Sequence, residues 1–143
     1  MKAIETVYNG YRFRSRLEAR WAVFFDTLQW KYEYEPEGYQ FEDGTRYLPD
    51  FWLPDHGLFV EIKPQPDLTE DEDRKAKLLW RGSGKPVIVF CGPPWDVPMT
   101  YLMADPPFGL LKLFVSMVVH HCDVAKQAAQ SSRFEYGENG APA

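Results

Sequence analysis

The stretch RYLPDFWLPDHGLFVEIK, residues 46–63, decides the expected fold. Its first part, residues 46–53, is rich in the aromatic and aliphatic side chains typical of a strand. Pro49 inside this part marks an edge or a bulge, because proline cannot donate a hydrogen bond to a neighbouring strand. The turn-forming residues 54–57 return the chain into the apolar run at residues 58–63. The stretch therefore predicts an antiparallel hairpin.

The second strand carries an acid and a lysine two residues apart. Side chains alternate along a strand, so Glu61 and Lys63 point to one face while residues 58, 60 and 62 point to the core. The hairpin can bring Asp50 beside Glu61. Two carboxylates next to a lysine form the kind of oxygen site that Mg²⁺ prefers, with positions left for water and a phosphate oxygen. This arrangement predicts phosphodiester hydrolysis, in which Lys63 holds or helps to deprotonate the attacking water.

A helix is expected before the hairpin, at about residues 15–29. Residues Ser15 to Glu18 have the pattern of a capping box. Glu18 borders the apolar stripe of this helix, so it is a candidate third carboxylate, bound to a metal ion directly or through water; helix capping explains it equally well. A strand at residues 30–35 follows and completes a three-stranded meander. The stripe consists of residues at helical spacing, namely Leu17, Trp21, Phe24, Phe25 and Leu28.

A second capping box, Thr69 to Glu72, begins a helix that should end at about Arg81, before the glycines of residues 82–84. The apolar run at residues 86–91 then predicts a buried strand reached by a helical crossover. The order α, β, β, β, α, β predicts one α/β domain, with a mixed central sheet flanked by helices and a core at about residues 14–91.

The C-terminal part is expected to be an extension of the same domain, residues 92–136, followed by a mobile tail at residues 137–143. Residues 99–103 and 110–119 predict a hairpin, although residues 110–119 also suit a helix. Residues 122–133 look helical. No repeat or linker divides the chain, so residues 1–136 form one domain.

Charge and composition exclude several classes of protein. The chain has 143 residues with a formal net charge of −5 and 45% hydrophobic residues, so it is neither disordered nor suited to coating nucleic acid regardless of sequence. The N-terminal segment is locally basic. Its arginines are candidate phosphate ligands, because arginine offers paired donors, and a solvated helix face is an equal alternative. They are Arg12, Arg14, Arg16 and Arg20.

We expect no membrane attachment, because no run approaches the roughly 18 apolar residues that cross a bilayer and residues 1–10 do not resemble a signal peptide. A cytoplasmic location is the expectation. Cys91 and Cys122 are far apart and outside any CxxC pattern, which predicts two free thiols.

The motif Pro49-Asp50 with Glu61-Ile62-Lys63, and Glu18 as a helix-borne acid, resembles the PD-(D/E)xK nuclease superfamily. The resemblance covers about residues 14–91. Within that superfamily the spacing is similar to small phage junction-resolving endonucleases, and residues 11–20 are similar to uncharacterised phage-borne and prophage-borne proteins. It implies a restriction-endonuclease-like core and cleavage of DNA with Mg²⁺, or Mn²⁺ as a substitute. It also implies metal ligands at Asp50 and Glu61, and it places Lys63 in the position of the motif's lysine. It further implies that no small-molecule cofactor is needed and that the protein acts in a bacterial or phage-infected host cell.

Other copies of the short motifs do not fit as well. Asp73 and Lys75 fall inside a predicted helix, where residues two apart do not share a face. Asp67 follows the acid-x-lysine strand instead of preceding it. Asp55 is the alternative ligand if the hairpin register is shifted.

The sequence therefore predicts a Mg²⁺-dependent DNA endonuclease, with branched or junction DNA as a substrate that the resemblance favours. Because the chain is acidic, we expect it to act as a homodimer or with a partner protein. The alternative is a nuclease-fold module without turnover that binds DNA or a phage or DNA-processing protein. Action on RNA is a third, weaker hypothesis.

Overall fold

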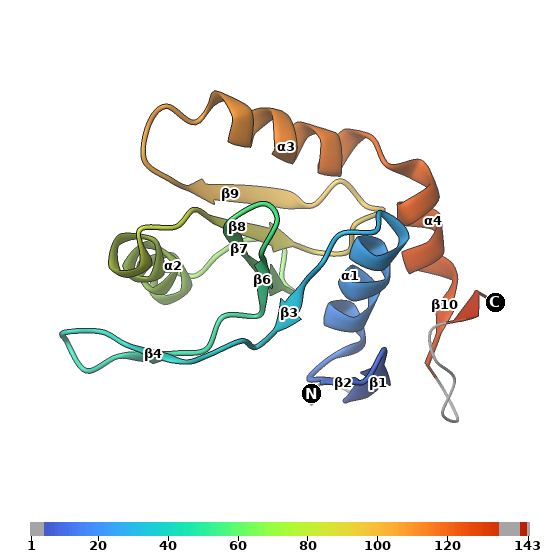
Figure 1. The fold of residues 1–143 in the computed structure, drawn as a ribbon, viewed down its shortest axis with the longest axis horizontal. Coiled ribbons are helices and arrows are strands. Elements are labelled where there is room, and N and C mark those ends of the chain that lie inside the picture. The colour runs from blue at the N-terminus through green and yellow to red at the C-terminus, as the bar shows by residue number, and fades with distance from the viewer. Residues whose placement is uncertain (1–4, 135–140, 143) are drawn as a thin grey trace.

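A five-stranded mixed sheet forms the centre of the protein (Figure 1). The structure is a computed structural model and describes residues 5–134 and 141–142. The strand order is β3-β6-β7-β8-β9; β7 and β8 are parallel, and the other neighbours are antiparallel. The α/β class and the mixed sheet are thereby confirmed. The five strands are β3 (Glu33–Tyr34), β6 (Phe51–Leu53), β7 (Leu58–Lys63), β8 (Val87–Cys91) and β9 (Met99–Met103).

The two predicted capped helices are present. Helix α1 (Arg16–Thr27) begins after Ser15, whose hydroxyl accepts a hydrogen bond from the Glu18 N–H. Helix α2 (Glu70–Ser83) has a complete capping box between Thr69 and Glu72. It ends at Gly84, whose φ of +70° suits glycine. Helix α2 then provides the crossover between the parallel strands β7 and β8.

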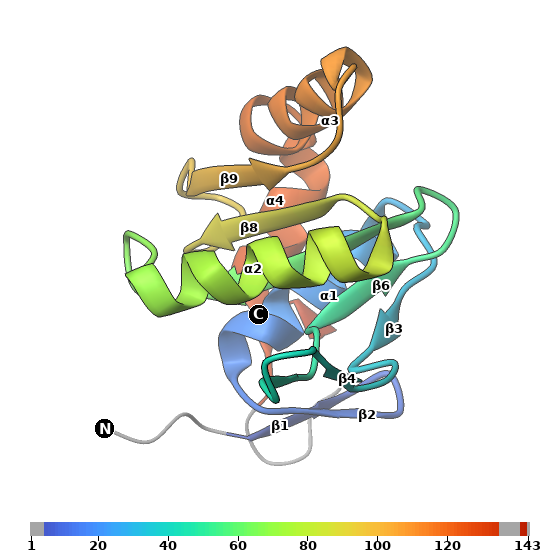
Figure 2. The same cartoon turned by 90° about the vertical axis from the view of Figure 1, so that its left-hand side faces the viewer.

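Helices cover both faces of the sheet (Figure 2). On the α1 face, Leu58, Val60 and Ile62 of β7 join the larger hydrophobic core, as their alternation predicted. On the α2 face, Phe59 and Val89 join a smaller core with Leu79. The face of β7 that carries Glu61 and Lys63 is therefore covered by α2 over part of its length.

The predicted strand at residues 46–53 is wrong in one respect, because it is two strands. Strand β5 (Arg46–Tyr47) pairs with β4 (Tyr39–Gln40) in a separate two-stranded arm, and β6 begins only at Phe51. Pro49 lies in the break, where it is not required to donate to a ladder. The first strand of the meander, β3, is also shorter than expected.

The structure adds an N-terminal hairpin to the predicted elements, formed by β1 (Thr6–Tyr8) and β2 (Tyr11–Phe13). Its turn is Asn9-Gly10, with φ of 51° and 81°. Positive φ at both positions is typical of a tight hairpin turn, so this dipeptide was the available signal.

The C-terminal extension contains β9 and two helices, α3 (Gly109–His120) and α4 (Asp123–Ser131). The hairpin expected for residues 110–119 is wrong, and the helical alternative is confirmed. The buried side of α3 repeats at helical spacing, which a strand cannot match; it is formed by Leu111, Phe114, Val115, Val118 and Val119.

After α4, strand β10 (Ser132–Arg133) pairs with β11 (Ala141–Pro142). The rest of the tail predicted at residues 137–143 lies outside the described residues. Cys91 and Cys122 are free thiols, as expected. Among the described residues, no helix has the length and apolar character needed to cross a membrane.

Candidate functional site

Asp50 and Glu61 face each other across the β6–β7 hairpin. The register pairs Phe51 with Val60, so extending it by one residue sets Asp50 opposite Glu61. The Asp50 N–H donates to Glu61 Oε1 at 3.0 Å, and the Ile62 N–H donates to Asp50 Oδ2 at 2.8 Å. Each carboxylate is thus held against the backbone of the other strand. The structure brings the two predicted acids together.

Asp50 directly follows the break at Pro49 and is held by hydrogen bonds to two neighbouring chain segments. Asp50 precedes β6, and its carbonyl accepts a hydrogen bond from the Glu35 N–H at 2.8 Å, just beyond β3. Its position is therefore fixed by hydrogen bonds from both neighbouring chain segments. Because the register is not shifted, the alternative ligand Asp55 lies exposed in the hairpin turn, at the other end of the strands.

The two carboxyl groups are in an environment that disfavours two negative charges. Glu61 is only 2% exposed, and burial raises its pKa to about 7. Burial, then the charge of Glu61, then that of Glu18 raise the pKa of Asp50 well above its ordinary value. A hydrogen bond from the Tyr47 hydroxyl acts in the opposite direction on the Glu61 pKa. A divalent cation would relieve this repulsion, and the all-oxygen donor pair suits Mg²⁺ or Mn²⁺.

Lys63 extends from the same face of β7 as Glu61, two residues further along. Its Nζ lies 3.7 Å from Glu72 Oε2. The other oxygen of Glu72 accepts hydrogen bonds from the Thr69 N–H at 2.9 Å and from Gln65 Nε2 at 2.7 Å. The capping residue of α2 therefore also orients the lysine.

The sequence pattern does not indicate Tyr47 and Glu72 as site residues. The capping role of Glu72 accounts for it in the sequence, and nothing in the local pattern connects it with Lys63. The sequence predicts Tyr47 on the same strand as Asp50, and its position three residues before Asp50 is the one signal that could point to it.

Glu18 is buried, and its carboxylate accepts hydrogen bonds from side chains outside the Asp50 and Glu61 pair. Its Oε2 accepts hydrogen bonds from the Tyr34 hydroxyl at 3.0 Å and from the Ser15 hydroxyl at 3.3 Å. Within residues 5–134, no three His, Cys, Asp or Glu side chains form a group that could hold a metal ion. Glu18 therefore stays a predicted participant beside the Asp50 and Glu61 pair, bound to a metal ion directly or through water.

The predicted phosphate-binding arginines have different surroundings. Arg20 Nη1 donates to the carbonyls of Ala129 and Ser132 at the end of α4, at 2.7 and 3.2 Å, so it supports helix packing. Arg14 is exposed and bonds both oxygens of Glu35, at 2.5 and 3.3 Å.

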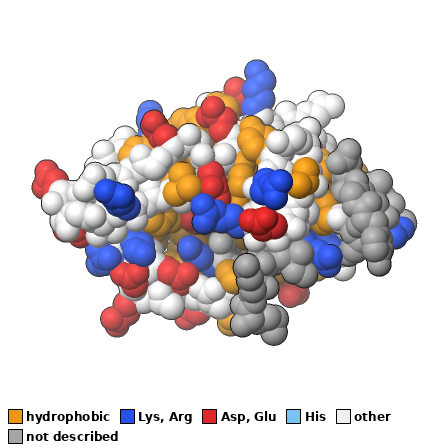
Figure 3. Space-filling view, turned by 90° about the horizontal axis from the view of Figure 1, so that it is seen from below, with side chains coloured by type: hydrophobic (Ala, Val, Ile, Leu, Met, Phe, Trp, Pro, Cys, Tyr) orange, Lys and Arg blue, Asp and Glu red, His pale blue; other side chains and the backbone are white. Residues whose placement is uncertain are grey.

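Arg12 is exposed and lies 3.5 Å from Glu5, whereas Arg16 is half-buried on α1. On the face shown in Figure 3, basic and acidic side chains are interspersed. A phosphate path would therefore use Arg12 and Arg14 more readily than Arg20.

The chain matches no protein-family model, no curated protein and no solved structure.

Proposed function

We propose that this protein is a Mg²⁺-dependent endonuclease that hydrolyses phosphodiester bonds in DNA, built on a restriction-endonuclease-like core. The observation that carries the proposal is the pairing of Asp50 and Glu61 across the β6–β7 hairpin with Lys63 on the same face. The surrounding order of α1, three antiparallel strands, α2 and a parallel strand is consistent with such a core.

Asp50 and Glu61 would hold the metal ion, and Glu18 would contribute through a water molecule. The ion supplies charge stabilisation at the phosphoryl oxygens and lowers the pKa of its bound water. Lys63 donates hydrogen bonds to the attacking water or to a phosphate oxygen. Glu72 positions the Lys63 ammonium, and Tyr47 stabilises the ionised form of Glu61.

The charge distribution indicates that attraction of phosphate groups is not the only source of affinity for the substrate. The net charge is −5, and Arg14 is paired with Glu35. Affinity then comes from a homodimer, a partner protein or the shape of a branched DNA. Measuring the molecular mass in solution, with and without branched DNA, distinguishes a dimer from a monomer.

The test is cleavage of branched, linear, nicked and single-stranded DNA with Mg²⁺, with Mn²⁺ and with EDTA. We expect Asp50→Asn, Glu61→Gln and Lys63→Met each to lower the rate by roughly 100-fold or more, the usual effect of removing a charge-stabilising group. Asp55→Asn is the matched control, because it makes the same change in the turn of the same hairpin. Activity that survives all three site substitutions would refute the assignment.

Metal titration by calorimetry separates the enzyme from the non-catalytic alternative. Mg²⁺ binding that Asp50→Asn abolishes, without cleavage of any DNA or RNA substrate, would favour a binding module.

A further inference from the structure

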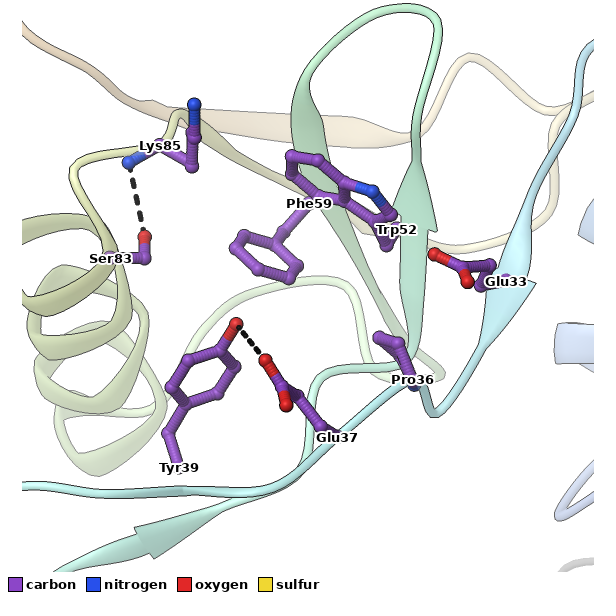
Figure 4. A pocket seen from close by; sticks show the side chains of 8 residues that line it. All are labelled: Glu33, Pro36, Glu37, Tyr39, Trp52, Phe59, Ser83 and Lys85. Atoms are coloured by element: carbon purple, nitrogen blue, oxygen red, sulfur yellow. Dashed lines mark hydrogen bonds between the residues drawn. The ribbon is translucent and has the colours of Figure 1, made fainter.

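A cavity of about 450 Å³ lies on the face of the sheet that also carries Glu61, although Asp50 and Glu61 do not themselves line it. This volume is within the range of ligand-binding pockets. Figure 4 shows aromatic rings around it, contributed by Trp52 of β6, Phe59 of β7 and Tyr39 of the β4–β5 arm. Trp52 is half-buried, so part of its ring is accessible from the pocket.

Strand register sets the distance between this pocket and the candidate metal site. Trp52 is directly opposite Phe59, with ring centroids 4.7 Å apart. Asp50 and Glu61 are the opposing pair two residues further along the two strands, on the same face. Two residues of strand span about 6.6 Å, so this is the spacing along the strand between the two pairs. One nucleotide can span that distance, so a phosphate at the acids would leave its neighbouring base near the rings.

The β4–β5 arm connects the two places. Tyr39 and Tyr47 are cross-strand partners in this arm. The Tyr39 ring packs edge-on against Phe59 at 6.0 Å, while the Tyr47 hydroxyl bonds to Glu61. One residue of the arm therefore lines the pocket and its cross-strand partner contacts Glu61.

The rim of the pocket carries charges of both signs on opposite sides. Glu33 and Glu37 lie on one side, and Lys85 lies on the other (Figure 4). Carboxylates accept hydrogen bonds from amino groups of bases, and a lysine attracts phosphate. Aromatic rings stack on the flat face of any base.

We propose that this pocket binds one unpaired nucleobase of the DNA, next to the phosphate that is cleaved, with preference for bases that carry an amino group. The inference rests on the proposed function and narrows its substrate to DNA with an unpaired nucleotide, such as a bulge or a branch point. A paired base cannot enter, because its hydrogen-bonding edge and both its faces are occupied in the duplex.

The test is DNA binding without cleavage. Fluorescein-labelled duplexes of one sequence, either fully paired or with one unpaired cytosine or thymine, are titrated with the Asp50→Asn protein in EDTA, and fluorescence anisotropy reports the affinity. We expect tighter binding to the unpaired cytosine than to the paired duplex. Trp52→Ala should weaken the cytosine complex by roughly 5- to 150-fold, the measured range for base stacking, and leave the paired duplex unchanged.

Further variants keep the test independent of folding defects. Trp52→Phe retains a ring and should retain the preference, whereas Glu33→Gln with Glu37→Gln, both exposed, should reduce discrimination of cytosine from thymine. Trp80→Ala is the matched control, because Trp80 packs against the same smaller core and does not line the pocket. Equal affinity for paired and unpaired duplexes, or an unchanged preference in Trp52→Ala, would overturn the proposal.

Two outcomes distinguish base binding in the pocket from the proposed nuclease activity. A base preference without any metal-dependent cleavage would support base binding in the pocket and refute the nuclease, and with it the placement of the base beside a cleaved phosphate. Cleavage without a base preference would refute only the pocket. Cytidine monophosphate serves as a competitor and should not displace the DNA. If cytidine monophosphate displaces the DNA at a concentration equal to that of the DNA, the occupant of the pocket is a free nucleotide. That result would overturn the proposal that the pocket binds a base within a DNA strand.

Discussion

At Glu61, burial and a hydrogen bond have opposite effects on the pKa of one carboxyl group. Burial raises the pKa to about 7, and the hydroxyl of Tyr47 lowers it from what burial alone would produce. Tyr47→Phe should therefore raise the Glu61 pKa further. We expect the acidic limb of the pH–rate profile to move upward by about one pH unit, since a hydrogen bond to a charged group contributes about 1.5 kcal/mol or more.

Tyr39→Phe is the control for this prediction. It removes the same hydroxyl from the cross-strand partner of Tyr47, where the hydroxyl donates to Glu37 instead of Glu61. Its acidic limb should stay in place. A profile that Tyr47→Phe leaves unchanged would show that Tyr47 does not set the protonation of Glu61.

At the scale of elements, Arg20 joins α1 to the end of α4. Its guanidinium donates to backbone carbonyls there and lies over the rings of Trp95 and Phe134, at 5.5 and 5.6 Å. The carbonyls at a helix C-terminus lack partners within the helix, so a cation stabilises them. Arg20→Ala should lower the free energy of unfolding by about 1–3 kcal/mol, measured by urea denaturation.

Arg12→Ala is the comparison at an exposed position. The Arg12 side chain is 73% exposed and faces Glu5 at 3.5 Å, so its loss should cost about 0.5 kcal/mol or less. The same two variants test the phosphate path. Arg12→Ala should weaken DNA binding more than Arg20→Ala does. A larger loss of affinity in Arg20→Ala would show that Arg20 contacts the DNA.

At the scale of the whole molecule, the carboxylate pair makes stability depend on pH. The folded chain retains protons that the unfolded chain releases above its carboxyl pKa values near 4, because the pKa values of Asp50 and Glu61 are raised. The pair therefore contributes less stability as pH rises from about 4.5 through about 7. The slope is at most about 1.4 kcal/mol per pH unit for each retained proton.

Comparison with Asp50→Asn isolates this effect. Titrating groups that do not interact with Asp50 act equally in both proteins, for example His56, whose pKa is lowered by burial. We expect the variant to gain stability relative to the parent as pH rises, in urea denaturation with EDTA. A stability difference between the variant and the parent that is constant from pH 4.5 to 8 would contradict raised pKa values at the Asp50 and Glu61 pair.

Metal binding should reverse the loss of stability. At pH 8, Mg²⁺ at 100 times its dissociation constant should stabilise the folded protein by about 2.7 kcal/mol, seen as a higher melting temperature. Asp50→Asn and Glu61→Gln should remove the increase. Asp55→Asn should keep it, since Asp55 lies at the other end of the hairpin.

Much of the fold was predictable because its signals are local. The capping boxes at Ser15 and Thr69 predicted the starts of α1 and α2, and the apolar run predicted β8. Alternation along β7 predicted which side chains share a face with Glu61. Residues 110–119 were ambiguous because a continuous apolar run suits either a strand or a helix until its neighbours are known.

The sequence by itself determined the main helices, the β6–β7 hairpin and the pairing of Asp50 with Glu61, because caps, periodicity and turns act between residues close in the chain. The tertiary structure alone decided the partners of these groups. It separated β5 from β6 at Pro49, brought the Tyr47 hydroxyl into hydrogen-bond contact with Glu61, and set Lys63 beside Glu72. These contacts join different elements, and their geometry depends on how the whole chain packs.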